Sequence, residues 1–382
     1  MNKTRLLAVA AIAASGALTA LPALADLMIG VSISLTGPTS ALGIPTKNGI
    51  ALWPKEIAGE KLNVIVLDDA TDPTKAVQNT RKFINEDKVD VIVGSVATPV
   101  AAAMADVAAE GKTVQLMLSP VNLPEGRGGW SFRMPQSTAV MAIPIVEQWK
   151  KLGVKTYGFL GYADAYGEAW LKDITPLAEK AGIKQVAVER FARTDTVVTG
   201  QALKLTSANP DAILVVASGS GSAMPHKGLV ERGYPKGKIY QTHGAATMDL
   251  IRVGGADVEG SFVSSGPAVV AEKLPDTNAS KALGVAFKNQ FEAANGKGSA
   301  NQFAAHAYDV VIVLQKAVPI ALKKGKPGTP EFRAALKDAF ETMGRTPVSQ
   351  GVLNWTAADH FGYTPETGVL LKVVNGDWQV VH

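Results

Sequence analysis

Short runs of aliphatic and β-branched residues alternate with longer segments of helical periodicity along most of the chain. Near-continuous apolar strands are typical of parallel sheets covered on both faces, and their alternation with helices predicts an α/β fold. The strands expected in the first half are Met28–Leu35, Leu62–Leu67, Val89–Val93 and Thr113–Leu118. The helices expected between them are Thr46–Ile57, Thr74–Asn85 behind an Asp72-Pro73 cap, and a run that starts near Thr98.

A second series of the same kind follows Pro135. Its expected strands are Thr156–Gly161, Lys184–Phe191, Asp211–Ala217, Lys238–Gln241 and Glu259–Ser264. Its expected helices are Ala139–Leu152, Gly167–Ala181, Thr199–Ser207 and Pro225–Arg232. After this series come helices over Ser280–Asn295 and Gln302–Lys323, then an antiparallel hairpin of Val369–Val374 and Trp378–Val381 around Asn375-Gly376. Two series predict two lobes, with a binding cleft where the carboxyl ends of their strands face each other.

The first 25 residues have the features of a secretory signal peptide. Lys3 and Arg5 precede a largely apolar stretch, and small residues end it at the cleavage spacing, so we expect cleavage before Asp26. A retained membrane anchor is the alternative, but the apolar run is short and ends at a processing site. Removal of the segment lowers the formal net charge from +4 to +2.

Composition narrows the possible functions. The chain contains no cysteine, which excludes thiol catalysis and thiolate metal sites. The sequence has no stripe of basic residues, which would indicate a nucleic-acid partner. The five histidines lack metal-ligand spacing and no nucleophile elbow is present, so we expect no catalytic residue, metal or cofactor. Adjacent Asp68 and Asp69 would point to opposite faces of a strand, and we expect them to order the loop before Asp72.

The segment Val91–Gly111 gives the clearest indication of a ligand site. A buried strand leads through a Gly-Ser loop to Thr98 and Pro99, which are favoured as N-cap and first helical residue. The free N–H groups and the positive dipole end of such a helix, beside a hydroxyl, can hold a carboxylate. An ordinary capped helix with nothing bound is the alternative interpretation.

Comparable loops follow the other strands and would line the same cleft. They offer hydroxyls, glycines and free amides, a set that suits a small polar ligand. Each also has a structural alternative: Tyr166 can pack under its helix, the Ser-Gly run at Ser218 can be a flexible turn, and a lone histidine such as His243 is often structural. The expected ligand-binding residues, with apolar walls from the aliphatic members, are Leu42, Thr98, Ser119, Val121, Asn122, Leu123, Tyr166, Ser218 and His243.

These residues lie in segments that resemble the leucine/isoleucine/valine-binding family of periplasmic receptors for ABC transporters. The resemblance runs the full mature length and is carried by IGVSISLTGPTSALG, LDDATDPTKAV, VIVGSVATPVAAAMADVAAEG, MLSP, DAYGEAW and GVLNWTAADHFGY. It implies a two-lobed type I periplasmic binding protein, each lobe a parallel sheet flanked by helices, with three crossovers forming a hinge. The implied lobes are residues 26–137 plus 268–348 and residues 138–267 plus 349–382.

The resemblance also implies residue roles. Thr98 takes the place of a family serine that holds the ligand carboxylate. Ser119 and Val121 fall in the segment whose hydroxyl and amides complete that grip, and Tyr166 matches a tyrosine on the opposite lobe.

Three departures from the family pattern affect the expected ligand. Amino-acid receptors of the family usually present an acidic residue to the ligand ammonium, where this chain has His243. A tyrosine common near Ser218 and an aromatic residue near Leu42 are also absent. A desolvated ammonium without a partner is strongly unfavourable. We therefore expect a small aromatic or 2-oxo carboxylate, such as a benzoate, hydroxybenzoate or arylglyoxylate; a branched-chain or other amino acid is the alternative.

The resemblance implies a non-enzymatic, monomeric protein of the periplasm that closes its lobes on a carboxylate and delivers it to an ABC permease in the inner membrane. A sensor subunit that feeds a signalling kinase is a second interpretation. An enzyme on an α/β fold is a third, and the lack of a nucleophile–base pair argues against it.

Overall fold

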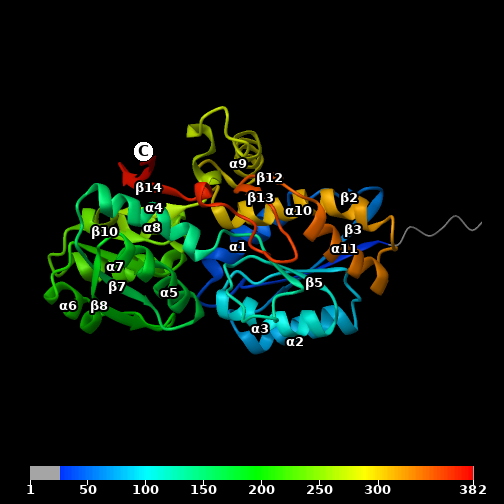
Figure 1. Cartoon of the computed structure of the whole chain (residues 1–382), viewed down its shortest axis with the longest axis horizontal. Helices are drawn as coiled ribbons and strands as arrows, with labels where there is room; N and C mark the ends of the chain where they lie inside the picture. The colour runs from blue at the N-terminus through cyan, green and yellow to red at the C-terminus, as the bar shows by residue number, and fades with distance from the viewer. Residues whose placement is uncertain (1–25, 382) are drawn as a thin grey trace, which may run out of the picture.

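The computed structural model describes residues 26–381, so the expected signal peptide lies outside the described residues. The chain forms two lobes that lie side by side, each built around one sheet (Figure 1). This is the predicted α/β architecture.

The first lobe contains a six-stranded sheet in the order β2 (Glu56–Ile57), β3 (Glu60–Asp68), β1 (Leu27–Ile33), β4 (Val91–Gly94), β5 (Val114–Met117) and β6 (Ser131–Arg133). Only the β2–β3 pair in this sheet is antiparallel. Helices α2 (Pro73–Asn85) and α3 (Thr98–Glu110) cover one face; α1 (Ser40–Ile50), α10 (Gln302–Ala321) and α11 (Pro330–Thr342) cover the other. Because successive strand side chains point to opposite faces, Met28 packs on the α2–α3 side and Ile29 on the α10 side.

The second lobe contains a seven-stranded sheet in the order β15 (Asp377–Val380), β14 (Val369–Val374), β11 (Phe262–Ser265), β10 (Ile239–Gln241), β9 (Ala212–Val216), β7 (Thr156–Tyr162) and β8 (Lys184–Phe191). Its helices are α4 (Thr138–Lys151), α5 (Ala165–Lys180), α6 (Thr199–Ser207), α7 (Ala223–Val230) and α8 (Met248–Gly254). The central strands are parallel, and β14 and β15 form the predicted antiparallel hairpin. Asn375 and Gly376 both have positive φ, as a tight type I′ turn requires.

Two parts of the first lobe differ from the sequence prediction. The first helix spans Ser40–Ile50, so the predicted Thr46–Ile57 was wrong: Trp53 precedes Pro54, which disfavours helical backbone there, and Glu56–Ile57 is a strand. Helix α11 was not predicted, although Thr329 caps it directly before Pro330.

The chain passes from β6 to α4 in the second lobe, returns after β11 to α9 (Lys281–Asn295) and α10, and reaches β14 last. A small two-stranded sheet of β12 (Thr346–Val348) and β13 (Gly351–Leu353) precedes the last passage. The sequence prediction placed residue 349 onward in the second lobe. In the structure the Trp355 ring packs 5.2 Å from Phe132 and 5.6 Å from Phe340, so residues 351–363 lie with the first lobe.

Helix α10 organises the first lobe. Among the described residues it is the one helix long and apolar enough to cross a membrane, but 67% of that apolar stretch is buried inside the protein. It is therefore a core helix here.

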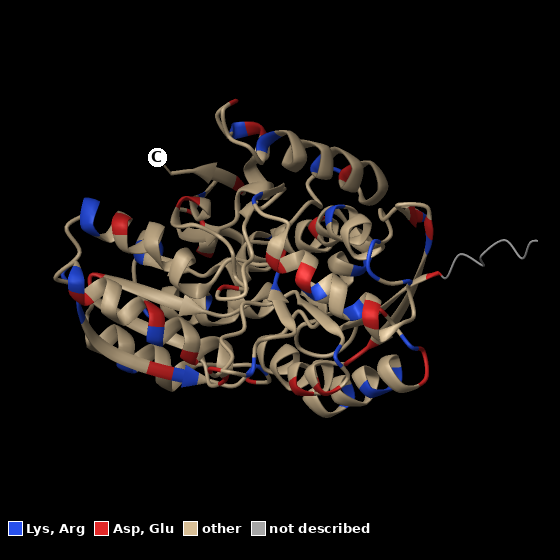
Figure 2. Cartoon of the chain, turned by 45° about the vertical axis from the view of Figure 1, so that its right-hand side comes forward, with Lys and Arg blue, Asp and Glu red and all other residues tan. Residues whose placement is uncertain are grey.

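Charged residues of both signs are interspersed along the outer helices (Figure 2), and no face in that view carries a single sign.

Candidate functional site

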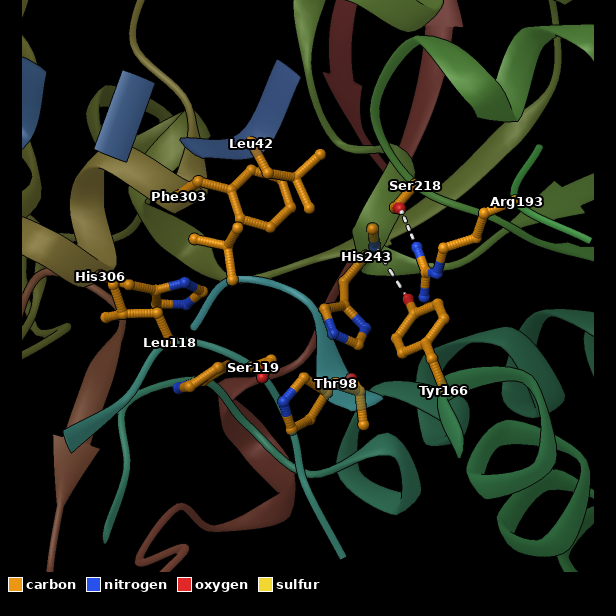
Figure 3. Close-up of a pocket in the computed structure, with 14 residues that line it drawn as sticks. Leu42, Thr98, Leu118, Ser119, Tyr166, Arg193, Ser218, His243, Phe303 and His306 are labelled. Atoms are coloured by element: carbon orange, nitrogen blue, oxygen red, sulfur yellow. Dashed lines mark hydrogen bonds between the residues drawn. The ribbon is translucent and has the colours of Figure 1, made fainter. Parts of the chain in front are cut away.

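A cavity lies between the two lobes (Figure 3). It receives loops from the carboxyl ends of strands in both sheets, as the fold predicts. Six of the nine residues expected from the sequence line it: Leu42, Thr98, Ser119, Tyr166, Ser218 and His243. The other lining residues are Val96, Leu118, Pro120, Pro135, Arg193, Gly244, Phe303 and His306.

The first-lobe wall is built on the turn from β4 into α3. Gly94 has φ +120°, and a Cβ there would lie 1.9 Å from the Ser32 carbonyl oxygen, so only glycine fits. Thr98 was predicted as N-cap; Ala97 takes that position instead, and Thr98 is the first helical residue with no capping hydrogen bond. The Thr98 hydroxyl therefore faces the cavity without a capping role, at the positive end of the α3 dipole, where Pro99 has no N–H and the Val100 amide already donates to the Ala97 carbonyl.

Two aspartates hold the loops behind this wall. The Asp69 carboxylate accepts hydrogen bonds from the hydroxyls of Ser34 (2.6 Å) and Ser95 (2.7 Å), which ties β1 to the β4–α3 loop. Burial tends to raise the pKa of Asp68, but hydrogen bonds from Thr36 and neighbouring amides outweigh it and lower the pKa to about 2. Both carboxylates are thus occupied in ordering loops, as predicted, and neither lines the cavity.

The second-lobe wall begins with Asp164. Its carboxylate caps α5 by accepting from the amides of Tyr166 (2.9 Å) and Gly167, and it pairs with the Arg193 guanidinium at 2.6 Å. Arg193 stacks 4.1 Å over the Tyr162 ring and donates to the Ser218 hydroxyl at 3.1 Å. One carboxylate therefore orients both an aromatic and a cationic lining residue.

Tyr166 is fixed at its other end as well. Its hydroxyl donates to the Thr242 hydroxyl at 2.9 Å and accepts from the Gly244 amide at 3.2 Å, and burial raises its pKa to about 12. A Cβ on Gly244 would lie 2.8 Å from that hydroxyl oxygen, so glycine is required. Tyr166 is a neutral group whose position is set by the loop after β10.

Two buried histidines face the cavity from opposite lobes. His243 lies in a short 3₁₀ turn of the second lobe, with its ring 5.7 Å from Tyr166 and 5.6 Å from Trp170. His306 lies on α10 in the first lobe. Burial lowers the pKa of each imidazole to about 3, so both are neutral at physiological pH. Each offers one donor and one acceptor nitrogen.

Three expected site residues do not line the cavity. Val121 is buried in a cluster around Met117, and its amide donates to the Ser119 carbonyl, so it is not free to grip a ligand. Leu123 packs at the edge of that cluster, and Asn122 is exposed. The apolar wall is formed by Leu42 with two residues that the sequence analysis did not single out, Leu118 and Phe303.

The remaining lining residues that the sequence did not predict lie on other elements. Arg193 follows β8, whose end was not considered as a cavity loop, and Phe303 and His306 lie on a helix that reads as core. The Asn301 cap before α10 accepts from the Phe303 and Ala304 amides, and it marks where that helix begins beside the cavity. A cap of this kind, followed by an aromatic residue and a histidine, was the available signal.

Comparison with known proteins identifies the class. Residues 26–376 match the family model for periplasmic binding proteins, and the chain belongs to this family, as its resemblance implied. It is 26% identical over 355 residues to Leu/Ile/Val-binding protein homolog 3 of Brucella melitensis, covering 87% of this chain and 88% of the relative. A solved extracellular ligand-binding receptor from Rhodopseudomonas palustris is 46% identical, with a TM-score of 0.92 over 94% of this chain and 99% of the receptor.

A more distant structure shares the fold. A solute-binding protein of an ABC transporter from R. palustris, solved in complex with benzoate, is 18% identical, with a TM-score of 0.77 over 94% of this chain and 96% of that one. Proteins of the family bind small molecules and work with ABC permeases. The chain is therefore a solute-binding protein with a type I fold, and its cavity lies between the lobes.

Proposed function

We propose that this protein captures a small carboxylate that carries no amine and serves as the periplasmic binding component of an ABC importer. The observation that supports this most directly is the charge of the cavity wall. Among the described lining residues, Arg193 carries a permanent charge and there is no aspartate or glutamate. The wall thus offers an anion the Arg193 guanidinium, which Asp164 behind it partly neutralises, and neutral hydrogen-bonding groups.

The proposed carboxylate position is the entrance of α3. The Thr98 hydroxyl is a donor there, and the positive end of the helix dipole favours negative charge. Ser119 lines the same end, although its hydroxyl donates to the Ser95 carbonyl at 3.1 Å and must rotate to reach a ligand. Arg193 lies in the opposite wall, where its guanidinium, although paired with the Asp164 carboxylate at 2.6 Å, is a charged hydrogen-bond donor.

The remainder of the ligand would lie against an apolar surface. Leu42, Leu118 and Phe303 supply flat or branched apolar side chains, which suit a ring or a short alkyl chain. We propose an aromatic or 2-oxo acid for this reason. The benzoate complex of the distant neighbour is in keeping with such a ligand for this fold.

A branched-chain amino acid is the second candidate, since the curated relative is described as a Leu/Ile/Val-binding protein homologue. Its ammonium would face neutral His243 rather than a carboxylate. A buried ammonium without an anionic partner loses several kcal/mol of hydration. The cavity chemistry therefore favours the amine-free acid.

In the proposed cycle, the secreted protein binds the acid between its lobes, and closure presents a surface that a permease recognises. Closure is driven by contacts that both lobes make to one ligand. The acid leaves chemically unchanged.

Calorimetric titration against a panel of acids tests the proposal. The panel pairs benzoate, phenylglyoxylate and 2-oxo-isocaproate with leucine, valine and phenylalanine, which match them in shape and add an ammonium. We expect an amine-free acid to bind tightest. Tighter binding of leucine or valine than of every amine-free acid would overturn the assignment.

A further inference from the structure

The cavity contains a second polar position that the proposed carboxylate grip does not use. His306 has 1% of its surface exposed, and neither ring nitrogen has a hydrogen-bond partner among the described residues. It lies on α10 in the cavity wall, and Figure 3 shows its ring directed from the helix towards the other lining residues. A buried polar group without a partner is unfavourable, which points to a group supplied from outside the chain.

The residues around His306 do not supply hydrogen-bond partners for its ring nitrogens. Gln302 lies four residues earlier on the same helix, but its side-chain amide donates to the His243 carbonyl oxygen of the other lobe. Phe303 meets the imidazole edge to face, with ring centroids 6.3 Å apart. Across the cavity, the Nδ1 atom of His243 is also without a partner. Two imidazoles, one from each lobe, therefore face the cavity with unused hydrogen-bonding capacity.

The position of His306 separates it from the charged end of the cavity. In Figure 3, Arg193, Ser218 and Tyr166 lie together at one side, His306 lies at the other, and His243 lies between. The apolar side chains of Leu42, Leu118 and Phe303 line the space beside them. A ligand held by its carboxylate near Thr98 can extend along these apolar groups to His306.

The chemistry of the position selects the group that it can hold. Burial keeps the imidazole neutral, so a second carboxylate would lack a cationic partner there. A neutral imidazole has one N–H donor and one acceptor nitrogen, and a hydroxyl has the complementary pair. A methyl group at the same point would leave the imidazole unpaired.

We infer that His306, with His243 opposite, forms a second subsite that selects acids carrying a hydroxyl on the part of the molecule remote from the carboxylate. This inference rests on the proposed function, because it needs the carboxylate to be held at the α3 end. It narrows the ligand class to hydroxylated aromatic acids.

Paired ligands that differ in one group test the inference. Calorimetry is run with para-hydroxybenzoate against para-methylbenzoate and with the corresponding meta pair, on the wild-type protein and on His306→Phe. In the wild type we expect the hydroxyl acid of at least one pair to bind about 10- to 100-fold more tightly than its methyl isostere. In His306→Phe that preference should fall to about threefold or less.

Thr98→Val is the matched control. It weakens the carboxylate grip common to both members of a pair, so both affinities should fall while their ratio is kept. A wild-type ratio near one for both pairs, or a ratio unchanged in His306→Phe, overturns the subsite. Failure of all four benzoates while a 2-oxo acid binds also overturns the subsite, whereas failure of every amine-free acid overturns the proposed function, and the two outcomes are distinct.

A measurement on the wild-type protein guards against a variant that does not fold. The ring nitrogens of histidine can be followed by ¹⁵N NMR in protein labelled at histidine. We expect the His306 signals to shift when the preferred hydroxyl acid is added, and to shift less with its methyl isostere. Equal shifts with both acids would also contradict the inference.

Discussion

The two walls of the cavity differ in how far their polar groups are already committed. In the second lobe, Asp164, Tyr166, Arg193 and Ser218 are joined by hydrogen bonds to one another or to neighbouring loops. In the first lobe, the Thr98 hydroxyl has no capping role and His306 has no partner. Apart from His243, whose Nδ1 atom has no partner, the second lobe presents a preformed surface, whereas the first presents groups that a ligand would complete.

This difference indicates a division of roles between the lobes. Groups that lack partners gain most from a ligand, so the first lobe is expected to supply the larger share of direct binding energy. Preorganised groups gain less from each contact, but they lose little conformational freedom when the lobes close. The second lobe would then act chiefly by orientation and charge.

The largest expected effect follows from placing a carboxylate in the preformed wall. In His243→Glu a buried negative group would face the ligand acid, so we expect acid affinity to fall by about 3–5 kcal/mol. Titration with the best acid of the panel measures the loss, and titration with leucine tests for gained amino-acid binding. His243→Gln is the control, since it remains neutral and polar. An unchanged acid affinity in His243→Glu would remove this residue from the site.

Removal of the cavity's cation is expected to have the next largest effect. Arg193→Met keeps much of the apolar stem but leaves the Asp164 carboxylate without its partner, so a negative group faces the incoming acid. We expect affinity to fall by about 2–4 kcal/mol. Arg190→Met is the matched control: its pair with Glu168 is exposed, and a loss below about 0.5 kcal/mol is expected. Equal losses in the two variants would show that Arg193 has no special role.

On the first-lobe wall, Thr98→Val removes one donor while keeping the shape of the side chain. A carboxylate that loses a hydrogen bond should bind about 1–3 kcal/mol more weakly. Thr80→Val is the control, because Thr80 is buried in the adjacent helix α2 and donates to the Ala76 carbonyl. Calorimetry on both variants compares them directly. Full affinity in Thr98→Val would refute the proposed carboxylate position.

Local sequence signals predicted much of the fold. Lys184–Phe191 and Thr199–Ser207 were predicted with the bounds that the structure has, because each shows a continuous local pattern of strand or helix periodicity. The first helix was misplaced because Pro45 lies inside it and its apolar spacing is weak. Residues 351–363 were assigned to the second lobe because the sequence does not show that Trp355 packs against Phe132 of the first lobe.

The site was less predictable than the fold. Residues directly after strands, such as Thr98 and His243, could be placed at one cleft because parallel strands end at the same edge; their role in binding is still a prediction. His306 could not be placed, since a helix buried on most sides gives no sequence signal for the face that meets a cavity. Val121 was misplaced because local order does not show that its amide turns back to Ser119.

The unpaired histidine of the first-lobe wall should also affect stability at low pH. The pKa of His306 is about 3 in the folded protein against 6.5 for a free imidazole, so between these values the unfolded chain binds more protons and stability falls as pH falls. His306→Phe removes this dependence. Relative to wild type, we expect the variant to gain about 1–2 kcal/mol between pH 7 and pH 5.

Urea unfolding at both pH values measures this gain. His243 and His226 have lowered pKa values and Asp309 a raised one, and these groups are present in both proteins, so their effects largely cancel in the difference. Phe303→Leu changes a neighbouring buried side chain that does not titrate, and its difference from wild type should not depend on pH. A pH-independent difference for His306→Phe would contradict the buried neutral imidazole.

The smallest effect is expected just outside the first-lobe wall. Asn122 follows Ser119 and Val121 in the segment that the family resemblance assigns to the ligand grip, but its side chain is exposed and does not line the cavity. Asn122→Ala should therefore change acid affinity and stability by less than about 0.5 kcal/mol, as is usual for exposed positions. Calorimetry compares the acid affinities of Asn122→Ala and Thr98→Val, since both residues were expected at the site from sequence. If Asn122→Ala weakened binding as much as Thr98→Val, the ligand would have to reach beyond the residues that line the cavity.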